Sequence, residues 1–189
     1  MSTKEKLLSL GKEFLLGAWD IVKIVIICFA VTLILTQCII VNAIIPSESM
    51  VPTLTVNSLL LCLRTDYWFD SPHRGDIVVF KRDVANDDVY YTKRVVGEPG
   101  DVVEIKQGTT YINGTAYEES WLAETPNAED YGPFKVPAGE YFLMGDNRNH
   151  SYDCRFWEEH FVPEEKIYAR GRLVISIDPV RVKLLRYAT

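Results

Sequence analysis

Two short stretches of the sequence contain residue types that can attack a peptide carbonyl. Residues 46–54 read PSESMVPTL and place Ser47 and Ser49 on either side of an acidic residue. Residues 90–101 read YYTKRVVGEPGD and place Lys93 among hydrophobic residues. A serine hydroxyl is a poor nucleophile until a base takes its proton, and a lysine can be that base only when it is neutral. We therefore consider a serine–lysine pair, although a Ser/Pro-rich linker and an ordinary surface lysine would give the same letters.

Lys93 has an unusual position for a charged residue. In a strand of period two it shares a face with Tyr91 and Val95, and burying an ammonium group there is costly. Burial can lower a lysine pKa from about 10.4 by as much as about 3–5 units, which would leave a neutral amine near physiological pH. The alternative is that the long side chain reaches past its neighbours to solvent.

Two further polar stretches could contribute to a site. Residues 73–80 read HRGDIVVF, a turn that leads into a strand, and residues 145–155 read GDNRNHSYDCR, a dense polar loop. Each could instead be a solvated turn. His150 lies next to Ser151 and is the one histidine that competes with Lys93 for the role of base, whereas His73 and His160 are expected at the surface.

The elements that must position these residues are predicted to be mainly strands. After residue 41 the chain contains short runs rich in Val, Ile, Tyr and Phe, broken by Gly, Pro and Asn, as expected for a β domain of short antiparallel strands. Asn113-Gly114 separates two such runs and predicts a hairpin with a type I′ turn. Residues 122–133 are polar and predict a surface loop. The predicted strands cover residues 59–63, 76–80, 89–96, 101–105, 109–112, 140–144 and 172–177.

An apolar segment precedes the β region. Residues 24–41 carry no charge, and with their flanks they reach the roughly 20 residues that a membrane-spanning helix needs. A buried core helix is the alternative. A cleaved signal peptide is disfavoured because its apolar region is shorter, about 7–15 residues, and no A-x-A-like cleavage site is evident.

Lysines give this segment a predicted orientation. Lys4, Lys6, Lys12 and Lys23 precede or open it, and no Lys or Arg follows until Arg64. The positive-inside rule then places the N-terminus in the cytoplasm. We expect residues 1–21 to be a cytoplasmic segment, residues 22–41 a single transmembrane helix of the cell membrane, and residues 42–189 an extracytoplasmic catalytic domain.

Composition and cysteine spacing exclude several functions. The net charge of −6 and the lack of a basic block argue against nucleic acid as a partner. The four cysteines form no CxxC pair, so we expect no metal site and no cofactor. Cys62 and Cys154 could form a disulfide in an oxidising compartment, but the sequence does not supply the required geometry.

Taken together, SESMVPTL, RGDIVVF, YTKRVVGEPGD and GDNRNHSYDCR resemble the boxes of type I signal peptidases, the bacterial-type leader peptidases of peptidase family S26, in order and in spacing. The resemblance implies the β-rich signal-peptidase fold. It also implies a membrane-bound serine endopeptidase that removes signal peptides from exported preproteins. Such an enzyme cleaves after small residues in an Ala-x-Ala-like pattern, through an acyl-enzyme and without a cofactor. The implied partners are signal peptides, the lipid bilayer and the neighbourhood of the secretion translocon.

The resemblance assigns roles residue by residue. Ser49 matches the nucleophile, Lys93 the general base and Ser47 the oxyanion-stabilising serine. The supporting set comprises Ser151, which would orient the lysine, and the bracing residues Asp146, Asp153 and Arg155, with Arg94 as partner of one aspartate. The near substrate pocket would be formed by Ile45, Pro46, Met50, Leu54 and Tyr91, and Ala43 and Thr92 would border the far pocket.

Some positions depart from this family pattern. Glu48 stands where many relatives have Gly, Cys154 stands where Ser is common, and Thr92 replaces a commonly aliphatic residue. Lys93 itself favours the bacterial or organellar type, because signal peptidases of the endoplasmic reticulum type carry His there. Alternative functions are a self-cleaving repressor, a non-enzymatic membrane-tethered β domain, and a peptidase specialised for pilins or for one exported protein.

Three consecutive aromatics, Tyr67, Trp68 and Phe69, suggest a contact with lipid. If they lie on a strand they alternate and cannot all face a core, so one or two should be exposed at the headgroup level; ordinary packing of two of them is the alternative. Ser49 follows Val41 by eight residues, so it lies within about 26–29 Å of the end of the apolar segment.

Overall fold

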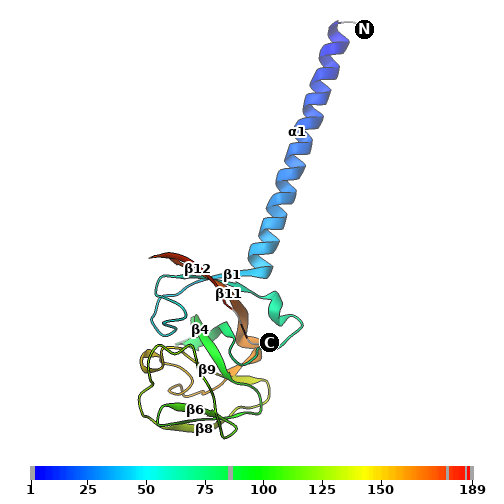
Figure 1. The fold of residues 1–189 in the computed structure, drawn as a ribbon. Helices are drawn as coiled ribbons and strands as arrows, with labels where there is room; N and C mark the ends of the chain where they lie inside the picture. The colour runs from blue at the N-terminus through cyan, green and yellow to red at the C-terminus, as the bar shows by residue number, and fades with distance from the viewer. Residues whose placement is uncertain (1–2, 85–86, 178, 186, 188–189) are drawn as a thin grey trace. The chain divides into compact units, whose positions relative to one another are not determined.

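The structure is a computed structural model that describes residues 3–84, 87–177, 179–185 and 187. The chain divides into two compact units, Met1–Ile39 and Ile40–Thr189. Figure 1 shows the first unit as one helix and the second as a β domain. We describe each unit separately.

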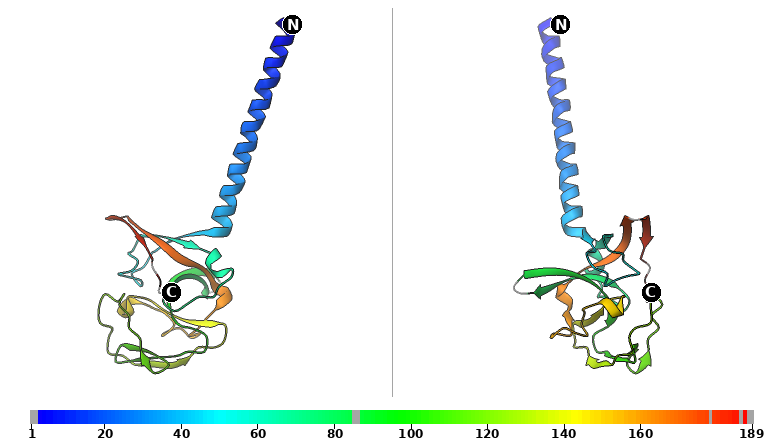
Figure 2. Two further views of the ribbon diagram at one scale, coloured as in Figure 1. Left: turned by 45° about the vertical axis from the view of Figure 1, so that its right-hand side comes forward. Right: turned by 90° about the vertical axis from the view of Figure 1, so that its left-hand side faces the viewer.

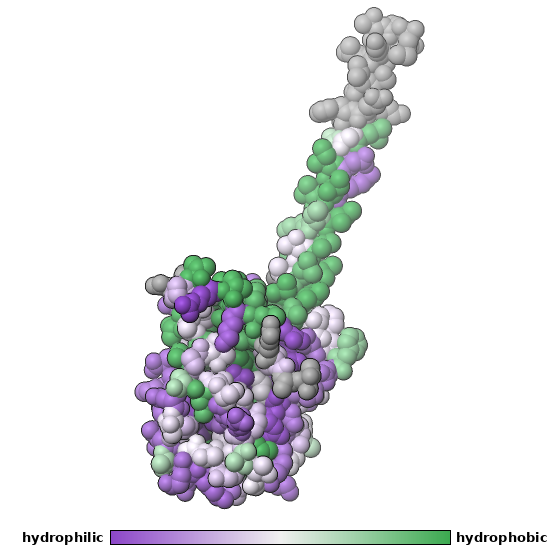
Figure 3. Space-filling model, in the orientation of Figure 1, coloured by the Kyte–Doolittle hydropathy of each residue, from purple (hydrophilic) through white to green (hydrophobic). Residues whose placement is uncertain are grey.

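The N-terminal unit is a long helix. Helix α1 spans Thr3–Ile34 and continues as a π-helical turn, η1, over Leu35–Ile39. Its segment Leu16–Ile34 is long and apolar enough to cross a membrane, and none of it is buried; Figure 3 shows this surface as predominantly hydrophobic. The helix ends two residues before the predicted boundary at Val41, because the chain enters strand β1 at Ile40. The side chains of residues 1–15, including the three lysines that carry much of the predicted orientation, lie outside the described part.

The larger sheet of the β domain has eight antiparallel strands in the order β1-β2-β11-β3-β4-β9-β10, with β12 paired to β11. Strand β1 is therefore an edge, and β4, which carries Lys93, lies between β3 and β9. The strands span Ile40–Ile44 (β1), Leu59–Leu63 (β2), Ile77–Val84 (β3), Asp87–Gly97 (β4), Glu140–Met144 (β9), Val162–Pro163 (β10), Ile167–Ile177 (β11) and Val180–Leu184 (β12).

The smaller sheet has the order β7-β6-β5-β8, and its strands come between β4 and β9 in the chain. Figure 2 shows it at the end of the β domain away from β12. Both Asn113 and Gly114 have positive φ, 52° and 81°, so the predicted hairpin is present and has the backbone that a type I′ turn requires. The strands span Val102–Lys106 (β5), Thr109–Ile112 (β6), Thr115–Ala116 (β7) and Tyr131–Lys135 (β8), and three short 3₁₀ helices span Thr65–Tyr67 (η2), Arg148–His150 (η3) and Glu164–Lys166 (η4).

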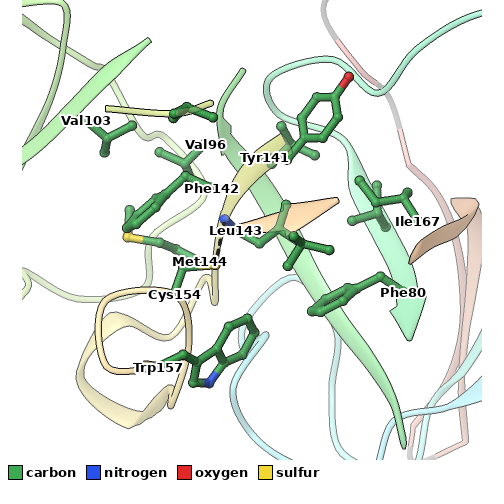
Figure 4. Close-up of a cluster of buried hydrophobic side chains, with 14 of the residues drawn as sticks. Phe80, Val96, Val103, Tyr141, Phe142, Leu143, Met144, Cys154, Trp157 and Ile167 are labelled. Carbon is green, nitrogen blue, oxygen red and sulfur yellow. Dashed lines mark hydrogen bonds between the residues drawn. The ribbon is translucent and has the colours of Figure 1, made fainter. Parts of the chain in front are cut away.

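The apolar core consists of two clusters. The larger cluster joins residues of both sheets, including Phe142, Leu143 and Val103, to Trp157 and Cys154 (Figure 4). The smaller cluster lies under β2 and β11 and contains Cys62. Both cysteines are free, since each is buried in a different cluster, so the disulfide that we considered between them does not form.

The predicted fold class, mainly antiparallel β after one N-terminal apolar helix, is confirmed. The prediction missed strands β1, β10 and β12. It also missed strand β8, because the predicted loop 122–133 covers the first three residues of that strand, which begins at Tyr131. Strand β10 has two residues and β1 follows the apolar helix directly, so neither gives a readable period-two pattern, whereas β12 reads VRVKL and its alternation was overlooked.

Candidate active site

Ser49 lies in a tight turn that joins β1 to β2. The Leu54 N–H donates to the Met50 carbonyl at 2.9 Å, and both side chains are buried in the core. On the other side, the Asn147 N–H donates to the Ser49 carbonyl at 3.0 Å. The serine backbone is therefore held both by the core and by the polar loop 145–155, while its hydroxyl is partly accessible.

Ser47 brings a second hydroxyl close to the candidate nucleophile. The Oγ atoms of Ser47 and Ser49 are 3.3 Å apart, which is within hydrogen-bonding distance, and Ser47 is exposed. The carbonyl oxygen of a substrate bound at Ser49 can therefore lie near both hydroxyls.

Lys93 is buried in the middle of β4, opposite Val78 of β3. Its side chain is only 3% exposed, and its Nζ donates a hydrogen bond to Ser151 Oγ at 2.9 Å. Burial disfavours the ammonium form and lowers the pKa of Lys93 to about 8, although the nearby charge of Asp153 opposes that shift. A substantial fraction of this lysine is thus neutral at mildly alkaline pH.

Gly145 allows the serine turn and the polar loop to approach each other. A Cβ atom built on Gly145 would collide with Ser151 Oγ and with the Ser49 carbonyl oxygen. Only glycine leaves room for this approach. Our sequence analysis gave this glycine no role, although it begins the GDNR motif and could have been singled out there.

Arg94 and Asp146 form a buried pair behind the reactive groups. Arg94 Nε donates to Asp146 Oδ1 at 2.7 Å and Nη2 donates to Oδ2 at 2.6 Å. Thr53 Oγ1 also donates to Asp146 Oδ2, at 2.5 Å, and Arg94 Nη1 donates to the Gly75 carbonyl at 2.6 Å. One ion pair thereby links all four polar stretches that the sequence analysis identified.

Asp153 and Arg155 form a second buried pair. Arg155 Nε lies 2.8 Å from Asp153 Oδ1, and the Gly145 N–H donates to Asp153 Oδ2 at 3.0 Å. Burial acts to raise the pKa of Asp153, but the Arg155 guanidinium outweighs it and holds that pKa below its usual value. This pair fixes the loop that presents Ser151 to Lys93.

A third ion pair was not anticipated from the sequence. Arg148 pairs with Glu119, and both side chains are almost fully buried. Arg148 Nε also donates to the Gly145 carbonyl at 3.0 Å, and its Nη1 donates to Thr110 Oγ1 at 3.0 Å. The segment around Glu119 therefore connects the small sheet to the site. Arg148 stands in a motif, but nothing in the sequence singles out Glu119 among the other acidic residues.

The candidate groups open onto one groove of about 770 Å³. Leu54, which we had placed in the near pocket, is fully buried in the core and is not among the described lining residues, because its side chain anchors the serine turn. The groove is lined near its reactive end by Ser47, Ser49, Lys93, Ile45, Pro46, Met50, Tyr91, Ala43 and Thr92.

His150 also lines the groove but is poorly placed to be the base. Its ring is largely exposed, and its Nδ1 lies 3.9 Å from the Glu48 carboxylate, which is also exposed. The hydroxyl of Ser151 is instead bonded to Lys93. The arrangement therefore contains a buried amine, two neighbouring hydroxyls and a rigid ionic support, which are the parts needed for acyl transfer.

Comparison with known proteins identifies the family of the chain. Residues 18–176 match the family described as "Signal peptidase, peptidase S26". Over 146 residues the chain is 44% identical to "Probable signal peptidase I-2" of Synechocystis sp. (strain ATCC 27184 / PCC 6803 / Kazusa), covering 75% of this chain and 65% of that protein. It is 39% identical over 162 residues to signal peptidase I of Bacillus licheniformis, covering 81% of this chain and 84% of that relative.

A solved structure of a signal peptidase I from Enterococcus faecalis V583 matches 53% of this chain and 97% of its own length, at 30% identity and a TM-score of 0.45. The family match extends over every candidate residue described above. The chain therefore belongs to the signal peptidase family, peptidase S26.

Proposed function

We propose that the chain is a membrane-anchored serine endopeptidase that removes N-terminal signal peptides from exported preproteins. The observation that carries this proposal is the burial and the lowered pKa of Lys93 in the groove. Lys93 is a buried amine whose pKa is lowered to about 8 and which lines the same groove as Ser49. Family membership supports the same reaction.

In the proposed reaction, neutral Lys93 Nζ takes the proton of Ser49 Oγ as that oxygen attacks the scissile carbonyl. A new C–O bond forms, and the carbonyl π electrons move to oxygen. When the tetrahedral intermediate collapses, the C–N bond breaks, and Lys93 gives its proton to the departing amine of the mature protein. A water molecule then attacks the acyl-enzyme with Lys93 again as base, which releases the signal peptide and restores Ser49.

We assign stabilisation of the oxyanion to Ser47, together with the Ser49 backbone N–H. The support is the 3.3 Å separation between the two serine hydroxyls. A donor of this kind acts on the charge that develops in the transition state, and removing one typically costs about 10²–10³ in rate.

Specificity for small side chains is proposed from the walls of the groove. Ile45 and Met50 are buried, and Tyr91 and Thr92 are half-buried on the opposite strand. We expect the walls formed by Ile45, Met50 and Tyr91 to favour a small residue directly before the cut. The residue third from the cut would lie between Ala43 and Thr92.

The proposed partners are signal peptides, the bilayer and a position near the secretion translocon, with the N-terminus in the cytoplasm. The apolar helix supports the anchor. A further apolar surface lies on the outer face of the large sheet, where register aligns the side chains of neighbouring strands. Its most exposed members are Ile44, Val180, Val182 and Leu184.

Trp68 and Phe69 add to the apolar surface of the β domain. Phe69 is 96% exposed and Trp68 is more than half exposed, whereas Tyr67 turns inward and its hydroxyl donates to Asp76 at 2.9 Å. Tyr67 ends η2, and Trp68 and Phe69 lie in the bend that follows it, so the three residues do not form the strand on which our alternation argument depended. Two of the three are nevertheless exposed, and we propose that they contact lipid.

Quenching of tryptophan fluorescence tests this lipid contact. In vesicles containing lipids with brominated acyl chains, the full chain should lose part of its quenching on substitution Trp68→Phe. Trp19 in the apolar helix should continue to be quenched and serves as the internal control. An unchanged quenched fraction in the variant would exclude Trp68 from the bilayer.

Cleavage of a preprotein by the full chain in detergent tests the proposed activity. Ser49→Ala and Lys93→Ala should each reduce turnover by about 10³-fold or more. Ser47→Ala should lower kcat by about 10²–10³ with little change in KM, because its hydroxyl acts on the transition state. Wild-type turnover in folded Ser49→Ala or Lys93→Ala protein would favour a non-enzymatic membrane-tethered domain.

A further inference from the structure

The groove continues beyond the residues assigned to the two small-residue pockets. Its far end is lined by Val41 of β1, Val89 and Tyr90 of β4, Tyr168 of β11, and Arg64. Neither the sequence analysis nor the proposed reaction gives these residues a role.

Strand geometry relates this end of the groove to the substrate. The near and far pockets are bordered by Ile45 and then Ala43, so a bound peptide would run back along β1. Two residues of an extended chain advance about 6.6 Å, both in the bound peptide and in β1. The residue fifth before the cut therefore reaches Val41 and points to the same side as the first and third. Val41 pairs with Cys62, and Arg64 comes two residues after Cys62, so the long Arg64 side chain lines the groove beside Val41.

Arg64 is held in place by aromatic side chains. Its Nη2 donates to the Tyr168 hydroxyl, and its Cζ lies 3.8 Å from the centre of the Tyr168 ring. The Tyr168 ring in turn packs against Tyr90, with 5.5 Å between centroids. A guanidinium ordered in this way has already lost most of the freedom that binding would otherwise remove.

The hydrogen bonding of Arg64 is incomplete. Its Nε is buried and has no acceptor among the described residues. Buried donors in proteins nearly always have a partner. Lys81 Nζ lies 5.5 Å from the centre of the Tyr90 ring.

We propose that Arg64, clamped by Tyr168, determines specificity at the fifth residue before the cut, favouring a side chain with an acceptor oxygen and most strongly a carboxylate. The inference rests on the proposed peptidase activity and extends it. A charge-assisted hydrogen bond from a guanidinium to a carboxylate is strong and directional. A lysine at the same substrate position would be repelled by Arg64.

Peptide cleavage by the full chain in detergent tests this inference. The probes are internally quenched peptides with alanine first and third before the cut and glutamate, glutamine, alanine or lysine fifth. We expect kcat/KM to be about tenfold higher for the glutamate than for the alanine peptide. Arg64→Leu should bring this ratio close to one, Arg64→Lys should retain part of it, and Tyr168→Phe should reduce it.

A matched control removes a cation elsewhere. Lys135→Leu, on the exposed small sheet, should leave the glutamate-to-alanine ratio at its wild-type value. Cleavage that depends on Ser49 but has a ratio near one in the wild type, or an unchanged ratio in Arg64→Leu and Arg64→Lys, would overturn the role of Arg64 alone. Peptides that are cleaved independently of Ser49, or not at all, would overturn both this role and the proposed function.

Discussion

Lys93 and Arg94 are neighbours on β4 and are buried to a similar extent, 3% and 6% exposed, yet their surroundings differ. The side chain of Arg94 enters a region of paired charges, where Asp146 accepts two hydrogen bonds from it. The side chain of Lys93 enters the groove region, where its described hydrogen-bond partner is the neutral hydroxyl of Ser151. Consecutive strand residues point to opposite faces, which allows two such different environments on adjacent residues.

This difference in surroundings suits Arg94 to structural support and Lys93 to proton exchange. A buried arginine with a bidentate carboxylate stays charged and fixed, so it can hold neighbouring chain segments in fixed positions. A buried lysine without a carboxylate partner pays the desolvation cost in its charged form, and its pKa falls to about 8. The paired region positions the serine turn and the polar loop, and the unpaired lysine is left free to exchange a proton.

Breaking the paired region should have the largest effect on stability. Arg94→Met leaves the Asp146 carboxylate buried without its counterion, and we expect a loss of about 3–5 kcal/mol in the free energy of unfolding. Denaturant unfolding of the β domain would measure this loss. A loss below about 1 kcal/mol would show that the pair is not a structural support.

The double variant Arg94→Met/Asp146→Leu is the control for that measurement. It removes both charges, so no uncompensated carboxylate remains, and it should recover a large part of the lost stability. Failure to recover would attribute the loss to packing of the Arg94 side chain, whose Cζ lies 4.3 Å from the Trp121 ring.

Removing the charge of Lys93 should change the stability of the fold less than Arg94→Met does, and in the opposite direction. Lys93→Met is expected to abolish activity and to stabilise the fold by about 3 kcal/mol at neutral pH, because burial lowers the pKa of Lys93 from 10.5 to about 8. Below about pH 8 both folded and unfolded states of the wild type bind the proton, so the full cost of burial is present.

The pH dependence of this stabilisation distinguishes charge from packing. Between about pH 8 and pH 10.5 the folded wild type has lost its proton and the unfolded chain has not, so wild-type stability rises with pH. The advantage of Lys93→Met should therefore shrink across that window in parallel thermal melts. A constant advantage up to pH 10.5 would mean that the burial of the ammonium is not its cause.

The sequence indicates the site residues that stand in motifs, including Asp146, Asp153, Arg155 and Arg94 of the two buried pairs, but not a partner that lies outside the motifs. Ser49, Lys93 and Ser151 stand in motifs, and one of them is a charged residue in an apolar strand, which is a visible anomaly. Glu119 has no such signal, because its partner Arg148 is brought to it only by the packing of the small sheet. Leu54 was misplaced because a motif gives proximity in sequence but not the direction in which a side chain points.

Strands in the middle of the sheet were predicted more completely than its edges. β2, β6 and β9 have the predicted bounds, because each is a distinct apolar run between turn residues. Strand β1 continues an apolar helix without a break in hydrophobicity, so only its pairing with β2 shows where the helix ends. Strand β12 reads VRVKL, in which apolar and charged residues alternate, so its period-two pattern was present in the sequence and was overlooked.

The pH profile of kcat/KM tests most directly the claim that Lys93 is a base made usable by burial. For the wild type acting on an Ala-x-Ala peptide, kcat/KM reports the ionisation of the free enzyme. It should rise with pH along a single limb with a midpoint of about 8 and then level off. The limb should be unchanged in His150→Ala. A midpoint of about 6.5 that disappears in His150→Ala would contradict the assignment and identify the histidine as the base.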